Sequence, residues 1–280
     1  MATEPIFQAP TGAMAQAFAT AGDLKSRLFK HQQFASNLME EKHDFIVYVP
    51  PTYMLEPERL YPVMFMQDGQ NLFDPETSFQ KGNYWHLGET ADELIDRGEI
   101  EPLVIVGIYN TGEHRIDEYT PVEDRRLGGG HADAYGQMLV EELRSFVAHN
   151  YRVLVSGANC AVGGSSLGGL VSMYLGLRYP NVFGKLAVMS PSVWWRNRAI
   201  LKTVEKLRHN TGQRIWLDIG TNESQRALPD VRLVKEGLER KGWREGENLG
   251  YMEVEGGEHS EWAWAQRVAP MLKFLFPAQK

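Results

Sequence analysis

The chain has 280 residues, of which 43% are hydrophobic and 23% charged, a composition that suits a domain with a substantial buried core. Its net charge of -7 argues against nucleic-acid binding, which depends on clustered Lys and Arg. The single cysteine, Cys160, excludes an intramolecular disulfide and a cysteine-based metal cluster. We therefore expect a small or neutral partner.

The first residues, MATEPIFQAP, lack a basic patch followed by an apolar core. No later stretch reaches the roughly 18 apolar residues that a membrane span needs. We expect a soluble, cytoplasmic protein without a membrane partner. A periplasmic or secreted protein whose signal peptide had been removed would show the same features.

Residues 1–40 are polar and Ala-rich with weak periodicity, so we expect an N-terminal arm that packs on or near the body. Over residues 41–280 the pattern is regular and predicts a single domain. Short runs rich in strand-forming residues predict strands. These runs are residues 43–50, 61–67, 102–110, 160–166, 185–190, 214–220 and 249–255.

Amphipathic stretches of helical length lie between several of these strands. They are residues 89–98, 133–151, 167–180, 198–210, 231–242 and 261–276. This alternation predicts an α/β fold, with a mostly parallel central sheet and helices on both faces, because parallel strands need crossover connections. In such sheets ligands bind at the carboxyl ends of the strands.

The stretch AVGGSSLGGL, residues 161–170, fits the pattern G-x-S-x-G with Ser166 at its centre. Ser165 does not fit, because Leu167 stands where the pattern would need glycine. Four glycines alone indicate only a tight turn. A strand before the motif and a helix after it are the context of a nucleophile elbow, so we predict that Ser166 is a nucleophile.

A serine nucleophile needs a base, and in α/β hydrolases the histidine follows the acid, which follows the serine. Only His209 and His259 come after Ser166. His209 lies at the expected end of a helix, where a polar or cationic residue has a structural role. His259 lies in a glycine-containing loop between the last strand and the last helix, and we predict that it is the base.

The acid is expected just past the end of a strand. Asp218 falls inside the strand predicted for residues 214–220, whereas Glu223 follows its carboxyl end and could orient the imidazole. Asp230 is a second candidate, although a carboxylate at a helix N-terminus also has a capping explanation. We favour Glu223 and leave Asp230 open.

Two backbone N–H groups are candidate oxyanion donors. One belongs to Leu167, directly after the nucleophile, and the other to Gln70 in the turn after an earlier strand. For Gln70 an ordinary turn at Asp68 and Gly69 is the alternative.

Four side chains are candidates for substrate binding: Trp194, Trp195, Trp262 and Arg115. Core packing explains the tryptophans equally well, and an ion pair that braces the loop explains Arg115. The eight histidines show no metal-binding spacing, so we expect no catalytic metal and no cofactor.

Together the motifs MQDGQNLFD, RIDEYTP, GGSSLGG, SPSVWW, DIGTNE and GGEHSEWAW resemble a known family. It is the esterase family of the α/β-hydrolase superfamily that includes enterochelin-esterase-like and feruloyl-esterase-like enzymes, with the mycobacterial mycolyltransferases as distant relatives. The motifs follow the family's order from about residue 43 to the end. Many relatives carry Asp where Glu223 stands.

The resemblance implies an α/β-hydrolase fold and a serine hydrolase that cleaves carboxylic esters of small molecules through an acyl-enzyme. By this resemblance Ser166 is the nucleophile, Glu223 the acid and His259 the base, with Gln70 and Leu167 as oxyanion donors. Acyl transfer to a sugar or alcohol is an alternative with the same chemistry at Ser166. A non-catalytic binding module is a third, although every expected position is filled.

Overall fold

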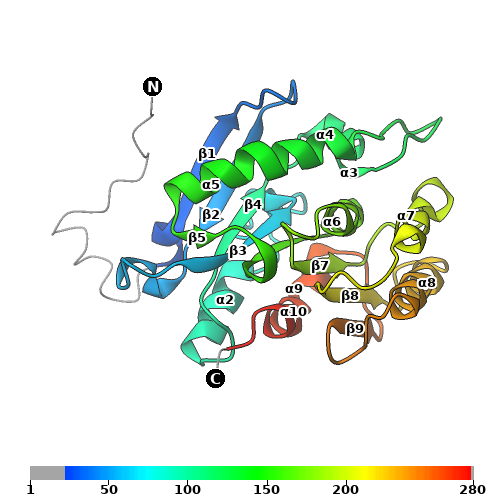
Figure 1. Ribbon diagram of the computed structural model, residues 1–280. Helices are drawn as coiled ribbons and strands as arrows, with labels where there is room; N and C mark the ends of the chain where they lie inside the picture. Colours follow the sequence, from blue (N-terminus) through cyan, green and yellow to red (C-terminus); the bar gives the residue numbers. More distant parts are fainter. Residues whose placement is uncertain (1–22, 279–280) are drawn as a thin grey trace.

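The computed structural model describes residues 23–278, and a nine-stranded sheet runs through them (Figure 1). The strands are β1 (Leu28–Phe34), β2 (His43–Tyr48), β3 (Tyr61–Gln67), β4 (Val104–Ile108), β5 (Val153–Leu154), β6 (Cys160–Ser165), β7 (Lys185–Met189), β8 (Arg214–Gly220) and β9 (Leu249–Val254). Their spatial order is β1-β2-β4-β3-β6-β7-β8-β9, and the short β5 pairs with β3. β2 is antiparallel to both its neighbours, whereas the strands from β4 to β9 are parallel. The seven predicted strands are confirmed.

Helices cover both faces of the sheet (Figure 1). One face carries α2 (Leu87–Asp96), α9 (Glu261–Ala265) and α10 (Val268–Leu275). The other carries α3 (Arg115–Tyr119), α4 (Ala132–Gln137), α5 (Arg144–Asn150), α6 (Leu167–Arg178), α7 (Trp195–Lys206) and α8 (Ala227–Arg240). A π-helical segment, Met138–Leu143, joins α4 to α5. Among residues 23–278, no helix is long and apolar enough to span a bilayer.

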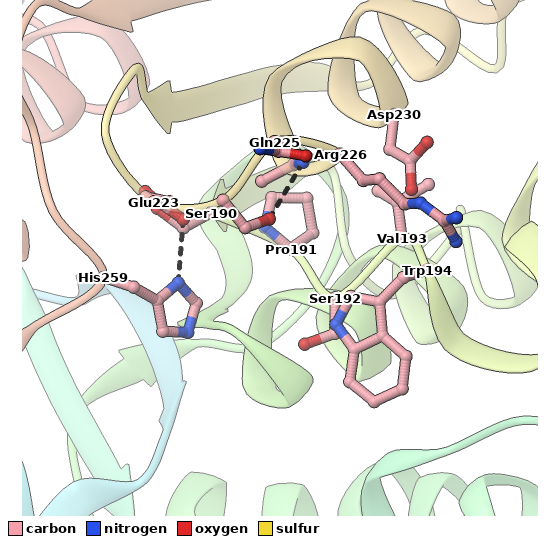
Figure 2. A pocket seen from close by; sticks show the side chains of 12 residues that line it. Ser190, Pro191, Ser192, Val193, Trp194, Glu223, Gln225, Arg226, Asp230 and His259 are labelled. Carbon is pink, nitrogen blue, oxygen red and sulfur yellow. Dashed lines mark hydrogen bonds and ion pairs between the residues drawn. The ribbon is translucent and has the colours of Figure 1, made fainter.

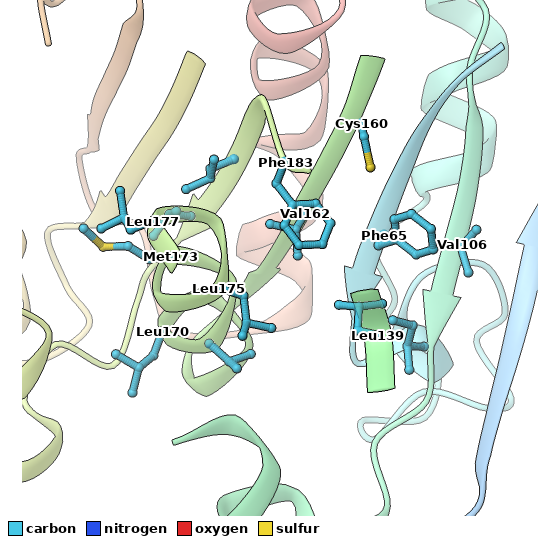
Figure 3. Close-up of a cluster of buried hydrophobic side chains, with 14 of the residues drawn as sticks. Phe65, Val106, Leu139, Cys160, Val162, Leu170, Met173, Leu175, Leu177 and Phe183 are labelled. Atoms are coloured by element: carbon cyan, nitrogen blue, oxygen red, sulfur yellow. The ribbon is translucent and has the colours of Figure 1, made fainter. Parts of the chain in front are cut away.

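The sheet separates two apolar cores. Every residue of the central strands β3, β4, β6 and β7 is buried, as expected for parallel strands covered by helices on both faces. Figure 3 shows part of one core, where Phe183 lies beside Val162 of β6, and Leu170 and Met173 of α6 belong to the same buried cluster. This packing holds β6 and α6 together at the turn that contains Ser166.

Part of the expected N-terminal arm belongs to the sheet. Residues 28–34, which lie within that arm, form β1 at the edge of the sheet and pair with β2. An edge strand has one neighbour, and no residue of β1 is fully buried, so its sequence carries only a weak apolar pattern. Residues 1–22 of the expected arm lie outside the described part of the chain.

Candidate active site

Ser166 lies at the sharp turn between β6 and α6. Its backbone has φ 58° and ψ -123°, a conformation that non-glycine residues rarely adopt and that is typical of functional sites. The turn passes close to the end of β3, because a Cβ atom on Gly168 would lie 3.0 Å from both Gln67 Cβ and Asp68 Oδ2. Ser165 is buried in the strand, whereas Ser166 is partly exposed. The geometry is that of a nucleophile elbow.

Three predicted residues lie together at the carboxyl ends of their strands. His259 Nε2 is 2.9 Å from Ser166 Oγ, and His259 Nδ1 is 2.8 Å from Glu223 Oε2. A neutral imidazole that donates from Nδ1 to the carboxylate accepts at Nε2, so it can receive the serine hydroxyl proton. Of the two acids left open, Glu223 contacts His259, whereas Asp230 pairs with Arg198 at 2.6 Å.

The environment of Glu223 keeps this carboxyl group ionised. Burial alone would raise the pKa of Glu223, but hydrogen bonds from His259, from the Ser190 hydroxyl and from the Gly220 N–H outweigh burial and lower it. The Glu223 side chain is 2% exposed, while that of His259 is 41% exposed. The acid is therefore shielded from solvent, and the base is open to it.

The two candidate oxyanion donors lie at helix starts. Leu167 is the first residue of α6, and Gln70 is the second residue of a 3₁₀ turn, Gly69–Asn71, that follows β3. The first N–H groups of a helix have no partner within the helix, so they are available to an anion. Gln70 and Ser166 line the same pocket.

Two pockets meet at His259. The first, here the Trp194 pocket, has a volume of about 690 Å³ and is lined by residues 190–194 and 223–227 with Asp230. Figure 2 shows His259 and Glu223 at one side of it, with Trp194 and Asp230 at the other.

The second, here the Arg115 pocket, has a volume of about 820 Å³ and includes Ser166, Asp68, Arg115 and Glu261. Nowhere in residues 23–278 do three or more His, Cys, Asp or Glu side chains form a group that could hold a metal ion.

The four candidate substrate-binding residues lie in different environments. Trp194 is 52% exposed and lines the pocket named after it. Trp195 is 1% exposed and donates its indole N–H to Val122 O at 2.7 Å, so the prediction that it contacts substrate is wrong and core packing explains it. Trp262 is exposed but lines neither pocket that adjoins His259. Arg115 lines its pocket and also forms the bracing ion pair.

Arg115 binds Asp68 through two parallel hydrogen bonds of 2.7 and 2.8 Å. Both alternatives considered for Arg115 are thus compatible with its position. Asp68 also accepts a hydrogen bond from Asn110 Nδ2 at 2.7 Å, so the turn before Gln70 is held from two directions.

Three residues of the site were not found from the sequence: Ser190, Trp264 and Arg267. Ser190 directly follows β7, a position that could have singled it out. Trp264 and Arg267 lie in the stretch for which the sequence predicts one amphipathic helix. The structure has two short helices there, α9 and α10, with Arg267 between them. All three are at least 95% buried behind Glu223 and His259.

The sheet order, the elbow and the position of the site at the strand ends define an α/β hydrolase. The sequence model of the family described as "Putative esterase" matches residues 36–275. The chain belongs to this esterase family, as the resemblance implied, and it is a carboxylic ester hydrolase.

Three further comparisons show what the chain is similar to. The chain is 28% identical over 214 residues to the uncharacterised protein YbbA of Bacillus subtilis (strain 168), covering 72% of this chain and 80% of YbbA. It is 29% identical over 152 residues to the iron(III) salmochelin esterase of Escherichia coli O6:H1 (strain CFT073), covering 53% and 32%. The crystal structure of the BES protein from Bacillus cereus shares the fold, with a TM-score of 0.71 at 20% identity over 90% of this chain and 95% of that one.

Proposed function

We propose that the protein hydrolyses small-molecule carboxylic esters through a triad of Ser166, His259 and Glu223 and an acyl-enzyme intermediate. The observation that carries this proposal is the continuous hydrogen-bonded line from Ser166 Oγ through the imidazole to Glu223, with distances of 2.9 and 2.8 Å. Both lie within the reach that proton transfer requires.

In this mechanism Ser166 Oγ attacks the ester carbonyl while His259 Nε2 takes the hydroxyl proton. The negative charge that develops on the carbonyl oxygen is stabilised by the N–H groups of Leu167 and Gln70. His259 then returns the proton to the leaving alcohol as the C–O bond breaks. Water then attacks the acyl group on Ser166 while His259 takes a proton from it. His259 returns this proton to Ser166 Oγ as the acyl–oxygen bond breaks, which releases the carboxylic acid and restores the serine hydroxyl.

The acyl and alcohol parts of an ester can bind in separate pockets on the two sides of His259. The Trp194 pocket offers an exposed indole to an apolar or aromatic part, whereas the Arg115 pocket offers charged and amide side chains to a polar part. A relative is named iron(III) salmochelin esterase, so siderophore esters are the first natural substrates to test.

The decisive experiment is labelling with a fluorophosphonate probe, followed by intact mass measurement and peptide mapping. Ser165→Ala is a matched control because Ser165 is the adjacent, buried hydroxyl. We expect Ser166 to be labelled in the wild type and in Ser165→Ala, and Ser166→Ala to lose both labelling and hydrolysis of p-nitrophenyl acetate. Hydrolysis that persists in Ser166→Ala at the wild-type rate would contradict the proposal.

A further inference from the structure

Glu223 has a second carboxylate oxygen, Oε1, which faces away from His259 toward buried polar side chains. These side chains are Ser190, Asp218, Trp264 and Arg267, and each is at most 5% exposed. Together with Glu223 they are here called the Arg267 cluster. Burying polar and charged side chains costs folding free energy unless they are paired, so the hydrogen bonds among these residues are needed to keep them buried.

Arg267 bridges four acceptors with one guanidinium. Its Nη1 donates to Ser190 Oγ and to Asp218 Oδ1, both at 2.8 Å. Its Nη2 lies 3.4 Å from Glu223 Oε1 and 3.3 Å from the backbone oxygen of Glu258. The planar fork of arginine suits several acceptors at fixed angles, which the point charge of lysine does not. The side chain of Arg267 is 1% exposed, so no substrate reaches it.

Ser190 connects this guanidinium to the acid. Its hydroxyl donates to Glu223 Oε1, while its oxygen accepts from Arg267 and from Trp264 Nε1 at 3.0 Å. The Trp264 ring also meets the His259 ring edge-on, with centroids 4.9 Å apart and planes at 82°. One buried assembly therefore contacts both the proposed acid and the proposed base.

The cluster also fixes the charge beside His259. Burial raises the pKa of Asp218, and the adjacent Arg267 guanidinium opposes this rise. With both carboxyl groups ionised beside the guanidinium, the cluster carries a net charge of minus one. Glu261 of α9 is a further carboxyl group near His259, and Glu258 directly precedes His259 in the sequence. The ion pair of Asp68 and Arg115 lines the pocket that His259 shares with Ser166. An imidazolium formed during catalysis neutralises the charge of the cluster.

We propose that Arg267 is a positioning residue for ester hydrolysis: it holds Glu223 directly and through Ser190, and together with Asp218 it sets the net charge that His259 experiences. This inference rests on the proposed triad. It has two separable consequences. Loss of the guanidinium fork lowers the rate, and a change in the net charge moves the pH at which His259 loses its proton.

The test measures kcat/KM for p-nitrophenyl acetate from about pH 5 to about pH 9, the range in which histidine titrates. The acid limb is the part of the profile in which kcat/KM rises as His259 loses its proton, and the plateau is the constant kcat/KM above it. Asp218→Asn makes the net charge of the cluster zero, so the acid limb should move to lower pH by about half a unit to one unit. Arg267→Lys keeps the charge, so the acid limb should stay in place while the plateau value falls between about 10-fold and 100-fold. In the double variant Asp218→Asn/Arg267→Gln the limb should return to the wild-type position and the plateau should remain low.

Arg232→Lys is the control, because Arg232 binds both oxygens of Glu253 in an exposed pair and lines neither pocket that adjoins His259. It should change neither the plateau nor the limb. Ser190→Ala keeps every charge of the cluster and should lower the plateau without moving the limb. It decides the positioning role if Asp218→Asn does not fold.

An acid limb that stays at the wild-type pH in folded Asp218→Asn would overturn the role of the charge. Wild-type plateaus in both Arg267→Lys and Ser190→Ala would overturn the positioning role. Fluorophosphonate labelling of Ser166 in the wild type is the separate readout for the triad, so a failure of the proposed function is distinguished from a failure of this inference.

Discussion

Gly69 determines how closely the proposed oxyanion turn approaches β4. A Cβ atom at this position would lie 2.2 Å from the carbonyl carbon of Gly107 and 2.3 Å from its oxygen. Carbon atoms make favourable contact at about 3.5 Å, so the turn would have to move by about 1.3 Å. Gly107 belongs to β4, whose residues are all buried. We therefore expect Gly69→Ala to displace Gln70 rather than the strand.

The expected cost to activity follows from this displacement. A misplacement of about 1 Å in an active site costs roughly 100-fold in rate, and removal of one oxyanion donor costs about 100-fold to 1,000-fold. We expect kcat/KM of Gly69→Ala with p-nitrophenyl acetate to fall about 100-fold. Overpacking costs about 1–3 kcal/mol, which a folded domain tolerates, so thermal unfolding should still show one cooperative transition.

Gly237→Ala in α8 is the control, because its Cβ would meet only side-chain atoms, Val204 Cγ1 at 3.2 Å and Arg240 Nη2 at 3.8 Å among those nearest to it. This variant should keep wild-type activity. If Gly69→Ala also kept wild-type kcat/KM while remaining folded, the reasoning that places Gln70 at the oxyanion would be refuted.

Two further predictions use neighbouring or paired side chains. Trp195→Phe loses the hydrogen bond to Val122 O and should lower the free energy of unfolding by about 1–3 kcal/mol without changing kcat/KM. Trp194→Ala should instead raise KM for aryl esters and leave the melting temperature unchanged. The opposite pattern would show that the wrong indole was assigned to the pocket. Because the pKa of Glu223 in the folded protein lies below the ordinary 4.5, its ionised form stabilises the fold above that pH, and this stability is lost as the pH falls through the lowered pKa. The melting temperature should therefore fall more steeply with decreasing pH below 4.5 for the wild type than for Glu223→Gln. Equal slopes for the two proteins would contradict this prediction.

The fold could be predicted where burial on both faces leaves an unbroken apolar run. β3 and β6 are such runs, and all their residues are buried. β1 was missed because an edge strand needs no such run. Its residues, LFKHQQF, include four polar side chains. Local sequence patterns also could not predict the spatial order of the strands. β3 lies between β4 and β6 in the sheet, although β4 comes between β3 and β6 in the sequence.

For the proposed site, the sequence predicted residues whose chemistry requires a particular order along the chain. Ser166 follows from the strand, turn and helix around it, and His259 follows from elimination and its loop. The sequence could not show which of Trp194 and Trp195 lines the pocket and which is buried. The two residues are identical neighbours, and only the backbone at the start of α7 gives their side chains different directions. Arg267 looked like a solvated helix residue, since its partner Asp218 lies 49 positions earlier.

The two arginines of the site explain how loops at strand ends acquire fixed directions. Asp68 follows β3 and Asp218 lies near the end of β8, and each is bound by an arginine from a later segment, Arg115 and Arg267. The strands determine where the loops begin, and these directional ion pairs determine where they point. The Arg115 side chain is 26% exposed in its pocket, whereas that of Arg267 is 1% exposed. We therefore expect substrate charge to perturb the pair beside Gln70, and the pair behind Glu223 to keep the electrostatics of the proposed base constant from one ester to the next.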